Sequence, residues 1–217
     1  MEIISVNIGK PSLVDYIGKE IFTGIYKSPV QEPLYLTATN LVGDGQADLE
    51  FHGGVNKALC VYCEEHYPYW ESKLNRELKH GAFGENLTVR GMLETDICIG
   101  DTYRFGEAIV QVSQPRQPCH KLAMRFDVAD LPVQVTDTGY SGFYFRVLQE
   151  GVISERRSIE LITKHPARVT IAYANQTKFH DKSNIEGIKS ILAVEELSAS
   201  WRESFKRRLQ ELEGYVS

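Results

Sequence analysis

The chain has few cysteines and no long apolar run. Its four cysteines, Cys60, Cys63, Cys98 and Cys119, are too few to form a disulfide framework in 217 residues, so we expect free thiols, as in a reducing compartment. No apolar stretch reaches the length of about 18 residues that a membrane-spanning helix needs. The first residues lack the charged-then-apolar order of a signal peptide. The sequence therefore predicts a cytoplasmic protein that has no membrane partner.

The sequence is also short of positive charge. Lysine and arginine number 24 against 29 aspartate and glutamate residues, which gives a net charge of −5. This balance argues against a nucleic-acid partner, because domains that bind nucleic acids are usually basic. The share of hydrophobic residues, 42%, and of charged residues, 24%, is typical of a globular protein.

Glycine and proline nearly disappear after residue 166. Fifteen of the 17 glycines lie at or before Gly151, and all eight prolines lie at or before Pro166. Because these residues mark turns between short elements, their loss indicates a change of architecture. We therefore predict a first domain over residues 1–165 and a second over residues 166–217.

Short segments rich in β-branched and aromatic residues dominate the first domain. Turn residues such as Gly100-Asp101 separate them, and many short strands with few helices favour a β-barrel over a parallel α/β sheet. Residues 64–78 and 120–126 break this pattern and predict helices. The predicted strands are residues 3–8, 21–26, 57–62, 97–99, 102–105, 108–112, 142–148 and 158–163.

The second domain is predicted to contain three helices. The first spans residues 167–178, the second begins at Ser183 with a capping box, and the third begins near residues 198–200 with another. Trp201 and Phe205 fall on the apolar face of the third helix. A unit of this size is marginally stable alone, so we expect it to pack on the barrel. Its basic residues are interpreted as a solvated helix face: Arg202, Lys206, Arg207 and Arg208.

The most unusual passage surrounds Cys119. Pro115 and Pro118 flank Arg116, and their fixed φ angles make a stiff loop that holds one thiol in place. The nearby cations favour the thiolate, which is the form that attacks a substrate or binds a soft metal. A buried structural cysteine is the alternative, but this setting favours the reactive thiol. The cations are Arg116, His120, Lys121 and Arg125.

Two glycine-rich passages are further candidates. His52-Gly-Gly with Lys57 is predicted to expose backbone amides beside a cation, which suits an anion, although a plain hairpin connection stays open. The passage lacks the spacing of a Walker loop, and the residues from Asp44 onward do not match a calcium loop. Glu85 and Asn86 lie where side chains can face a cleft. Weaker candidates for lining an anion pocket are Lys10, Lys19 and Lys27.

Two other motifs are rejected. Cys60-Val-Tyr-Cys63 matches the redox pattern C-x-x-C, but no thioredoxin-like context surrounds it. On a strand its two thiols would point to opposite faces, so we interpret both as packing residues. A zinc site of His52, His66, Cys119 and His120 lacks the paired spacings of known sites.

Together these passages resemble the MOSC-domain family of the YiiM type, named after the C-terminal domain of molybdenum cofactor sulfurase. The resemblance covers nearly the whole chain, including the predicted three helices at its end. It rests on Gly43-Asp-Gly-Gln-Ala-Asp, His52-Gly-Gly-Val-Asn-Lys, Phe83-Gly-Glu-Asn-Leu, Ile99-Gly-Asp and Gln111-Val-Ser-Gln-Pro-Arg-Gln-Pro-Cys.

The resemblance implies a mainly β fold, a MOSC-type barrel with a few helices, followed by a three-helix domain. It also implies binding of the molybdenum cofactor, molybdopterin, a pterin that carries a dithiolene and a terminal phosphate. In the family, the cysteine that matches Cys119 is the proposed molybdenum ligand or sulfur carrier. Relatives are associated with reducing N-hydroxylated compounds, such as hydroxylamino-purine base analogues, and so with their detoxification.

These implications assign roles to particular residues. Cys119 is the expected catalytic residue and the expected molybdenum ligand. Asp44, Asp48 and Glu85 orient the cofactor contacts, relay a proton or brace the loops. The expected cofactor contacts are Lys57, His52, Asn86, Arg116, Lys121 and Arg125.

Functions of different classes stay open. The first is an oxidoreductase that reduces N-hydroxylated small molecules. The chain has no nucleotide-binding glycine fingerprint and no cysteine set for an iron–sulfur cluster, so a separate reductase is its expected electron donor. The second is a non-catalytic carrier of the cofactor or of persulfide sulfur on Cys119. The third is an interaction module. The physiological substrate and the oligomeric state are left open.

Overall fold

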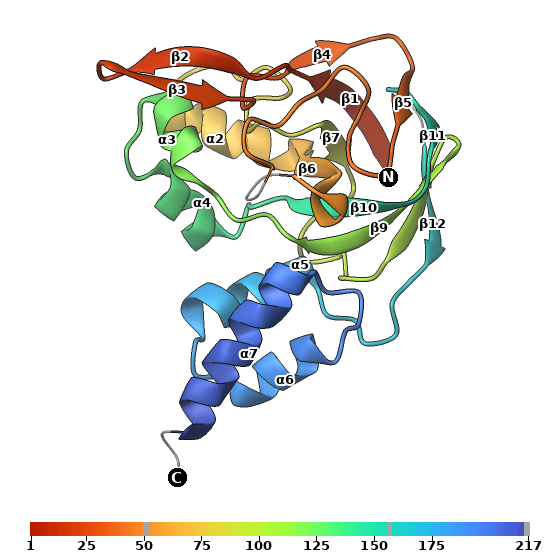
Figure 1. Cartoon of the computed structure of the whole chain (residues 1–217), viewed down its shortest axis with the longest axis vertical. Helices are drawn as coiled ribbons and strands as arrows, with labels where there is room; N and C mark the ends of the chain where they lie inside the picture. Colours follow the sequence, from red (N-terminus) through yellow and green to blue (C-terminus); the bar gives the residue numbers. More distant parts are fainter. Residues whose placement is uncertain (50–52, 156–157, 215–217) are drawn as a thin grey trace.

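An eight-stranded sheet of mixed direction forms the centre of the computed structural model, which describes residues 1–49, 53–155 and 158–214 (Figure 1). The strand order is β12-β8-β9-β10-β6-β7-β1-β4, and the one parallel pair in this order is β6 with β7. The strands are β1 (Glu2–Ile8), β4 (Ser28–Val30), β6 (Leu59–Cys63), β7 (Leu87–Arg90), β8 (Thr102–Phe105), β9 (Ala108–Pro115), β10 (Phe143–Gln149) and β12 (Ile159–Thr163).

Two short antiparallel pairs accompany the large sheet. β2 (Ser12–Tyr16) and β3 (Lys19–Thr23) form a hairpin, in which Ile17 and Gly18 both have positive φ angles, as a tight two-residue turn requires. β5 (Leu34–Leu36) pairs with β11 (Gly151–Ile153). Residues 97–99 form no strand, because Cys98 contributes only an isolated bridge to Thr170.

The large sheet is curved, but no closed barrel is found. The predicted β-barrel is therefore not confirmed. One bridge joins Glu2 to Ser158, and the Ile159 amide donates to the Met1 carbonyl at 3.0 Å. No ladder connects the edge strands β4 and β12 within the described ranges. β4 has three residues, and its Pro29 has no amide hydrogen to donate to a further strand. The sheet therefore ends there.

Aromatic side chains fill the centre of the main core. Phe145 of β10 makes edge-to-face contacts with Tyr103, Phe105 and Phe143 at ring distances of 5.9, 5.2 and 5.3 Å. All four side chains are buried. Such contacts add to the free energy that burial of their apolar area contributes. The aromatic centre of the core therefore comes from β8 and β10, the two strands that flank β9 in the sheet.

Short helices cover the other face of β6 (Figure 1). The helix predicted over residues 64–78 is shorter, because a 3₁₀ turn precedes it, Pro68 lies in its first turn, and Asn75 ends it in a left-handed conformation. The sequence did not predict α4, which begins with a proline in its first turn. The segments are η1 (Val55–Lys57), η2 (Glu64–His66), α2 (Tyr67–Leu74), α3 (His120–Phe126) and α4 (Leu131–Thr138).

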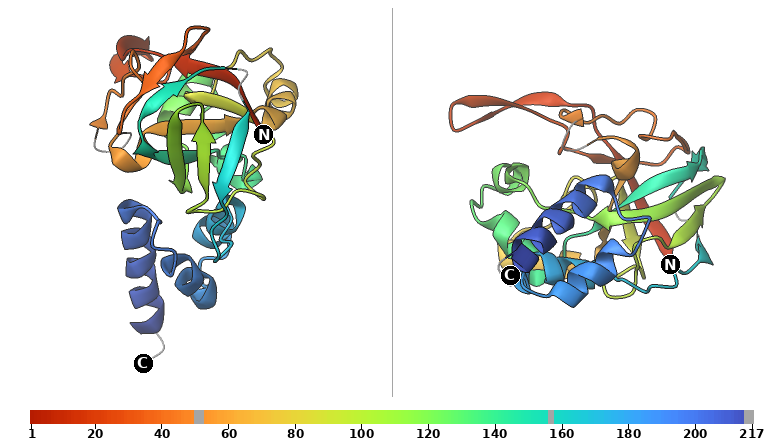
Figure 2. Two further views of the ribbon diagram at one scale, coloured as in Figure 1. Left: turned by 90° about the vertical axis from the view of Figure 1, so that its right-hand side faces the viewer. Right: turned by 60° about the horizontal axis from the view of Figure 1, so that its bottom comes forward.

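The C-terminal helices lie together at one end of the molecule (Figure 2). They pack on the sheet, as predicted, because Ile171, Trp201 and Phe205 belong to the same core cluster as the aromatic residues of β8 and β10. Asn184, rather than Ser183, caps α6, and its Oδ1 accepts from the Gly187 amide at 2.7 Å. The segments are α5 (Ile171–Asn175), the π-helical turn η3 (Gln176–His180), α6 (Ile185–Leu192) and α7 (Ala199–Gly214).

Two arginines of α7 connect the helices instead of forming a solvated face. Arg202 donates to the carbonyl oxygens of Leu192 and Val194 at the end of α6. Arg208 donates to the Lys178 carbonyl at 2.8 Å. The prediction of a solvated basic face is therefore wrong for these two residues, because the last carbonyls of a helix need donors.

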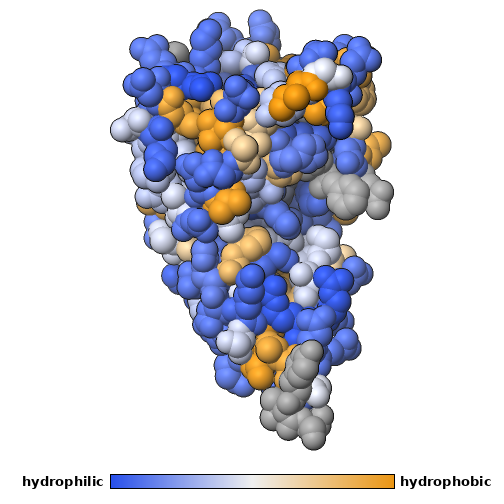
Figure 3. Space-filling view, turned by 90° about the vertical axis from the view of Figure 1, so that its left-hand side faces the viewer, coloured by the Kyte–Doolittle hydropathy of each residue, from blue (hydrophilic) through white to orange (hydrophobic). Residues whose placement is uncertain are grey.

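The surface is consistent with a sequence that has no long apolar run. The face shown in Figure 3 is largely hydrophilic, and its hydrophobic residues lie in separate patches. None of the helices in the described ranges is long and apolar enough to span a bilayer.

Candidate functional site

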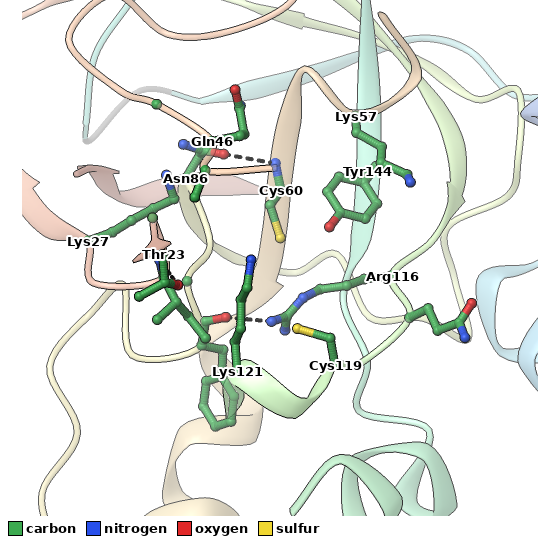
Figure 4. A pocket seen from close by; sticks show the side chains of 17 residues that line it. Thr23, Lys27, Gln46, Lys57, Cys60, Asn86, Arg116, Cys119, Lys121 and Tyr144 are labelled. Atoms are coloured by element: carbon green, nitrogen blue, oxygen red, sulfur yellow. Dashed lines mark hydrogen bonds between the residues drawn. The ribbon is translucent and has the colours of Figure 1, made fainter. Parts of the chain in front are cut away.

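A pocket lies between β6, the loop before α3 and the loops that follow β3 and precede β7 (Figure 4). It encloses about 620 Å³, part of which is open to solvent. Five of the residues predicted for the site line it, namely Lys57, Asn86, Arg116, Cys119 and Lys121.

Cys119 lines this pocket and is drawn in Figure 4. It is the extended residue directly before α3, with φ −126° and ψ 167°. All four cysteines are free, but Cys60, Cys63 and Cys98 are buried, whereas Cys119 is half-buried. The thiol predicted to be reactive is therefore the most exposed of the four.

Arg116 lies beside Cys119 and is buried, with 6% of its surface exposed. Its Nη2 donates to the Phe83 carbonyl at 2.5 Å, whereas its Nη1 has no hydrogen-bond partner within the described ranges. Burial alone would lower the pKa of this guanidinium, but Cys60 and Tyr144 raise it above its ordinary value. A buried charged donor without an acceptor is costly, so this atom is placed to receive a ligand oxygen.

Cys60 and Tyr144 complete the pocket, and the sequence did not predict either. They are opposite each other in the antiparallel pairing of β6 with β10. Burial is the main cause that raises the pKa of both side chains. Cys60 is thus not a packing residue like Cys63, which lies in the main core on the opposite face of β6, as the C-x-x-C spacing predicted. Only knowledge of the strand pairing would have identified the two residues.

A buried ion pair supports the wall formed by Lys27 and Asn86. Asp44 accepts hydrogen bonds from Lys27 Nζ, from the Gly9 amide at 2.9 Å and from Asn86 Nδ2 at 2.8 Å. Asn86 Oδ1 in turn accepts from the Cys60 amide at 3.1 Å. Asp44 therefore braces the loops. Lys27 lines the pocket, but the other two lysines proposed with it, Lys10 and Lys19, are exposed and do not.

Replacing Asp44 by alanine is expected to destabilise the protein by about 3–5 kcal/mol, because it leaves the buried Lys27 ammonium without its partner. Urea denaturation measures the free energy of unfolding. Asp15→Ala is the matched control, since Asp15 is exposed in the β2–β3 hairpin, and it should change that energy by less than about 0.5 kcal/mol. Equal stability of the two variants would contradict the bracing role.

Glu85 shapes the loop that contributes Phe83 and Gly84 to the pocket. Its carboxylate is fully buried and accepts hydrogen bonds from Tyr67 Oη, the Gly81 amide at 2.9 Å, the Phe83 amide at 3.0 Å and Thr88 Oγ1 at 2.9 Å. These bonds hold the turn whose Phe83 carbonyl receives Arg116. Glu85 therefore braces the pocket.

Of the remaining residues predicted for the site, some line the pocket and others do not. Burial lowers the pKa of Lys57, and Asp48 partly offsets this. His120 lies outside the pocket lining, and His52 lies outside the described residues. Arg125 does not line the pocket either, since it donates to the Ile25 carbonyl and stacks over the Tyr26 ring at 5.1 Å.

Metal-ligating side chains cluster at one place in the described part of the chain, at Cys63, His66 and Glu94. This set differs from the rejected zinc site, of which only His66 is a member. Glu94 Oε2 lies 2.7 Å from His66 Nε2, its Oε1 accepts from the Gly142 amide, and Cys63 donates to the Met92 carbonyl. Because these groups satisfy one another, they form a structural network.

Comparison with known proteins identifies two family matches. The MOSC domain matches residues 48–160, and the YiiM-like three-helix domain matches residues 169–212. The uncharacterized protein YflK of Bacillus subtilis is 50% identical over 97% of this chain and 95% of its own length. The crystal structure of YiiM from Geobacillus stearothermophilus superimposes with a TM-score of 0.82, at 42% identity, over 96% of this chain and 98% of that one.

A third relative is much longer. A Gibberella moniliformis protein named "Reductase" is 36% identical over 68% of this chain, but the match covers only 27% of that protein.

Proposed function

The chain belongs to the MOSC-domain family and carries its YiiM-like three-helix domain, and from this membership we propose that it is a molybdenum-cofactor-dependent reductase of N-hydroxylated compounds. The family supports a function related to the cofactor, and the similarity to a protein named a reductase supports the direction of the reaction. The structural observation that supports the proposal best is the accessible Cys119 thiol beside a buried guanidinium whose Nη1 lacks a partner.

The residues of the pocket fit this cofactor. A thiolate is a soft ligand, so Cys119 is the group that would hold molybdenum. Arg116 Nη1, Lys57 and Lys121 are donors or cations that suit the oxygens of a phosphate-bearing pterin. Asn86 is fixed by Asp44 and the Cys60 amide, so its contribution is to keep the wall in place.

The reaction requires two electrons and two protons, so that R–NHOH becomes R–NH₂ and water. The bound cofactor supplies the redox chemistry that removes the oxygen. The chain supplies a shielded site, because Phe83, Cys60 and Tyr144 are buried walls of the pocket. Burial raises the pKa of Tyr144, and its protonated hydroxyl, which bonds with the Cys60 side chain, is a donor that a substrate oxygen would compete for. The electrons come from a separate reductase.

The proposal is tested with protein produced in a host that makes the cofactor. Molybdenum content is measured first, and the loaded protein is then given an artificial electron donor with a hydroxylamino-purine. We expect turnover in proportion to bound molybdenum. Loaded protein that reduces no N-hydroxylated compound would contradict the proposal. Protein without molybdenum but with a stable additional sulfur atom on Cys119 would instead indicate a sulfur carrier.

A further inference from the structure

A wider groove continues from the Cys119 pocket to the C-terminal helices. It shares Cys119, Lys121 and Tyr144 with the pocket, and its far end is lined by Lys178 of η3 and by residues of α7. With the part open to solvent it encloses about 1490 Å³. The three-helix domain therefore forms one wall of a site that begins at the reactive thiol.

Lys178 is a buried cation at that end of the groove. Its Nζ donates to Ser204 Oγ at 2.9 Å and lies 4.4 Å from the centre of the Trp201 ring. No other acceptor and no carboxylate pairs with Nζ in the described part of the chain, although an ammonium has three hydrogens to donate. Burial, with help from Arg208 and Arg207, lowers its pKa to about 8. Such a group is costly for folding unless a ligand supplies the missing anion.

The groove side of α7 adds further donors. Ser200, Ser204 and Arg207 follow at spacings of four and three residues, so they lie on one face of the helix, and all three line the groove. Arg207 is exposed, and its side chain makes no hydrogen bond or ion pair within the described ranges. Among the described residues that line the groove, Asp48 is the one carboxylate, and the cations are Lys57, Lys121, Lys178 and Arg207. The far end of the groove thus favours an anion.

The groove also contains a neutral acceptor. Gln114 at the end of β9 is buried and lines the groove, and its Oε1 has no partner within the described ranges. An unpaired buried amide oxygen is satisfied by an N–H group, which heterocyclic bases carry. The groove therefore offers an acceptor for a base and cations for an anion.

We propose that Lys178, Ser204 and Arg207 form a phosphate-binding site, and that the substrate is a nucleotide whose N-hydroxylated base reaches Cys119 while its phosphate binds the C-terminal helices. The inference rests on the proposed function for the base, whereas the phosphate site stands on the groove alone. A phosphate monoester suits the site because its oxygens accept from an ammonium, a hydroxyl and a guanidinium together. The terminal phosphate of the cofactor has the same chemistry, so the experiment must separate the two sources.

The first arm measures binding to the full chain without cofactor. Titration calorimetry compares adenosine 5′-monophosphate with adenosine. We expect the monophosphate to bind about tenfold more tightly, which corresponds to ~1.4 kcal/mol. Lys178→Met and Arg207→Gln should each remove most of this preference, whereas Lys206→Met, at an exposed position of α7 outside the lining, should keep it. Equal binding of both compounds to the wild type, or an unchanged preference in Lys178→Met, would overturn the phosphate site.

The second arm identifies the source of the phosphate. Molybdenum content of Lys178→Met and Arg207→Gln should equal that of the wild type, while kcat/KM for the hydroxylamino-purine nucleotide falls about tenfold and that for the nucleoside stays the same. A fall in molybdenum content would assign the site to the cofactor and overturn the nucleotide proposal. Nucleotide binding without any turnover would contradict the proposed reductase but support the phosphate site.

A folding control accompanies both arms. Methionine has a volume similar to that of lysine and no charge, so Lys178→Met should raise the thermal unfolding temperature. A fold that is more stable, together with weaker binding of the monophosphate, would indicate that Lys178 is retained for its ligand. Arg207→Gln changes an exposed position, so its effect on binding is independent of folding.

Discussion

Cys119→Ala is expected to abolish reduction of N-hydroxylated compounds while leaving the fold intact. The thiol is the soft ligand of the pocket, and the alternative sulfur, Cys60, is buried on β6 with a pKa raised by that burial. Changes next to metal ligands typically cost ~10–100-fold in affinity or activity, and loss of the ligand itself should cost more. Because Cys119 is half-buried, the free energy of unfolding should change by less than about 1 kcal/mol.

The matched control is Cys98→Ala. This residue is a buried thiol outside the pocket lining, where its backbone amide bonds to Asp101. Its removal should lower stability but leave molybdenum content and turnover per bound molybdenum unchanged. Both variants are measured for metal content, turnover and urea denaturation. Full activity in Cys119→Ala would contradict the role given to this cysteine.

Glu85→Ala is expected to destabilise the protein by about 3–5 kcal/mol, as much as Asp44→Ala, because several buried donors lose their acceptor. The substitution leaves two backbone amides and two hydroxyl groups without the acceptor that they share in the buried interior. It also releases the turn that presents the Phe83 carbonyl to Arg116. The substitution should therefore lower both the free energy of unfolding and the affinity for the ligand. Urea denaturation at neutral pH measures the free energy of unfolding.

Two controls accompany this variant. Glu85→Gln keeps the shape and one acceptor oxygen, so it should recover part of the lost stability. Glu77→Ala removes an exposed carboxylate from the loop after α2 and should stay within about 0.5 kcal/mol of the wild type. If Glu85→Ala were as stable as Glu77→Ala, the hydrogen bonds of Glu85 would not hold the pocket together.

Local patterns predicted individual elements better than their arrangement. The strand over residues 102–105 and the helix over residues 120–126 were predicted with their observed bounds, because turn residues and proline mark their ends. α4 was missed because its segment is rich in β-branched residues, and its helix packs with α3 around buried Leu131 and Val135. Barrel closure depends on contacts between distant edges, which no local pattern encodes.

The same holds for the pocket: residues within a sequence motif were predicted, and residues that strand pairing brings together were not. Cys119 and Arg116 were found because prolines and cations gather around them in the sequence. Cys60 and Tyr144 were missed because only the register of β6 against β10 brings them to the pocket. Lys178 lies in a segment predicted simply as a helix, and its importance arises from Ser204 and Trp201, which are more than twenty residues further along the chain.

The shared core of sheet and C-terminal helices also sets the order in which the molecule matures on the ribosome. β9 is synthesised well before Trp201 and Phe205, which join its core, and before Ser198, whose amide donates to the Ser113 carbonyl of β9. Domains generally fold from the N-terminal side as they emerge. Here the apolar side of the sheet stays uncovered, and the groove stays open, until α7 has left the exit tunnel. Enclosure of a bound ligand therefore requires that α7 has been synthesised and has packed on the sheet.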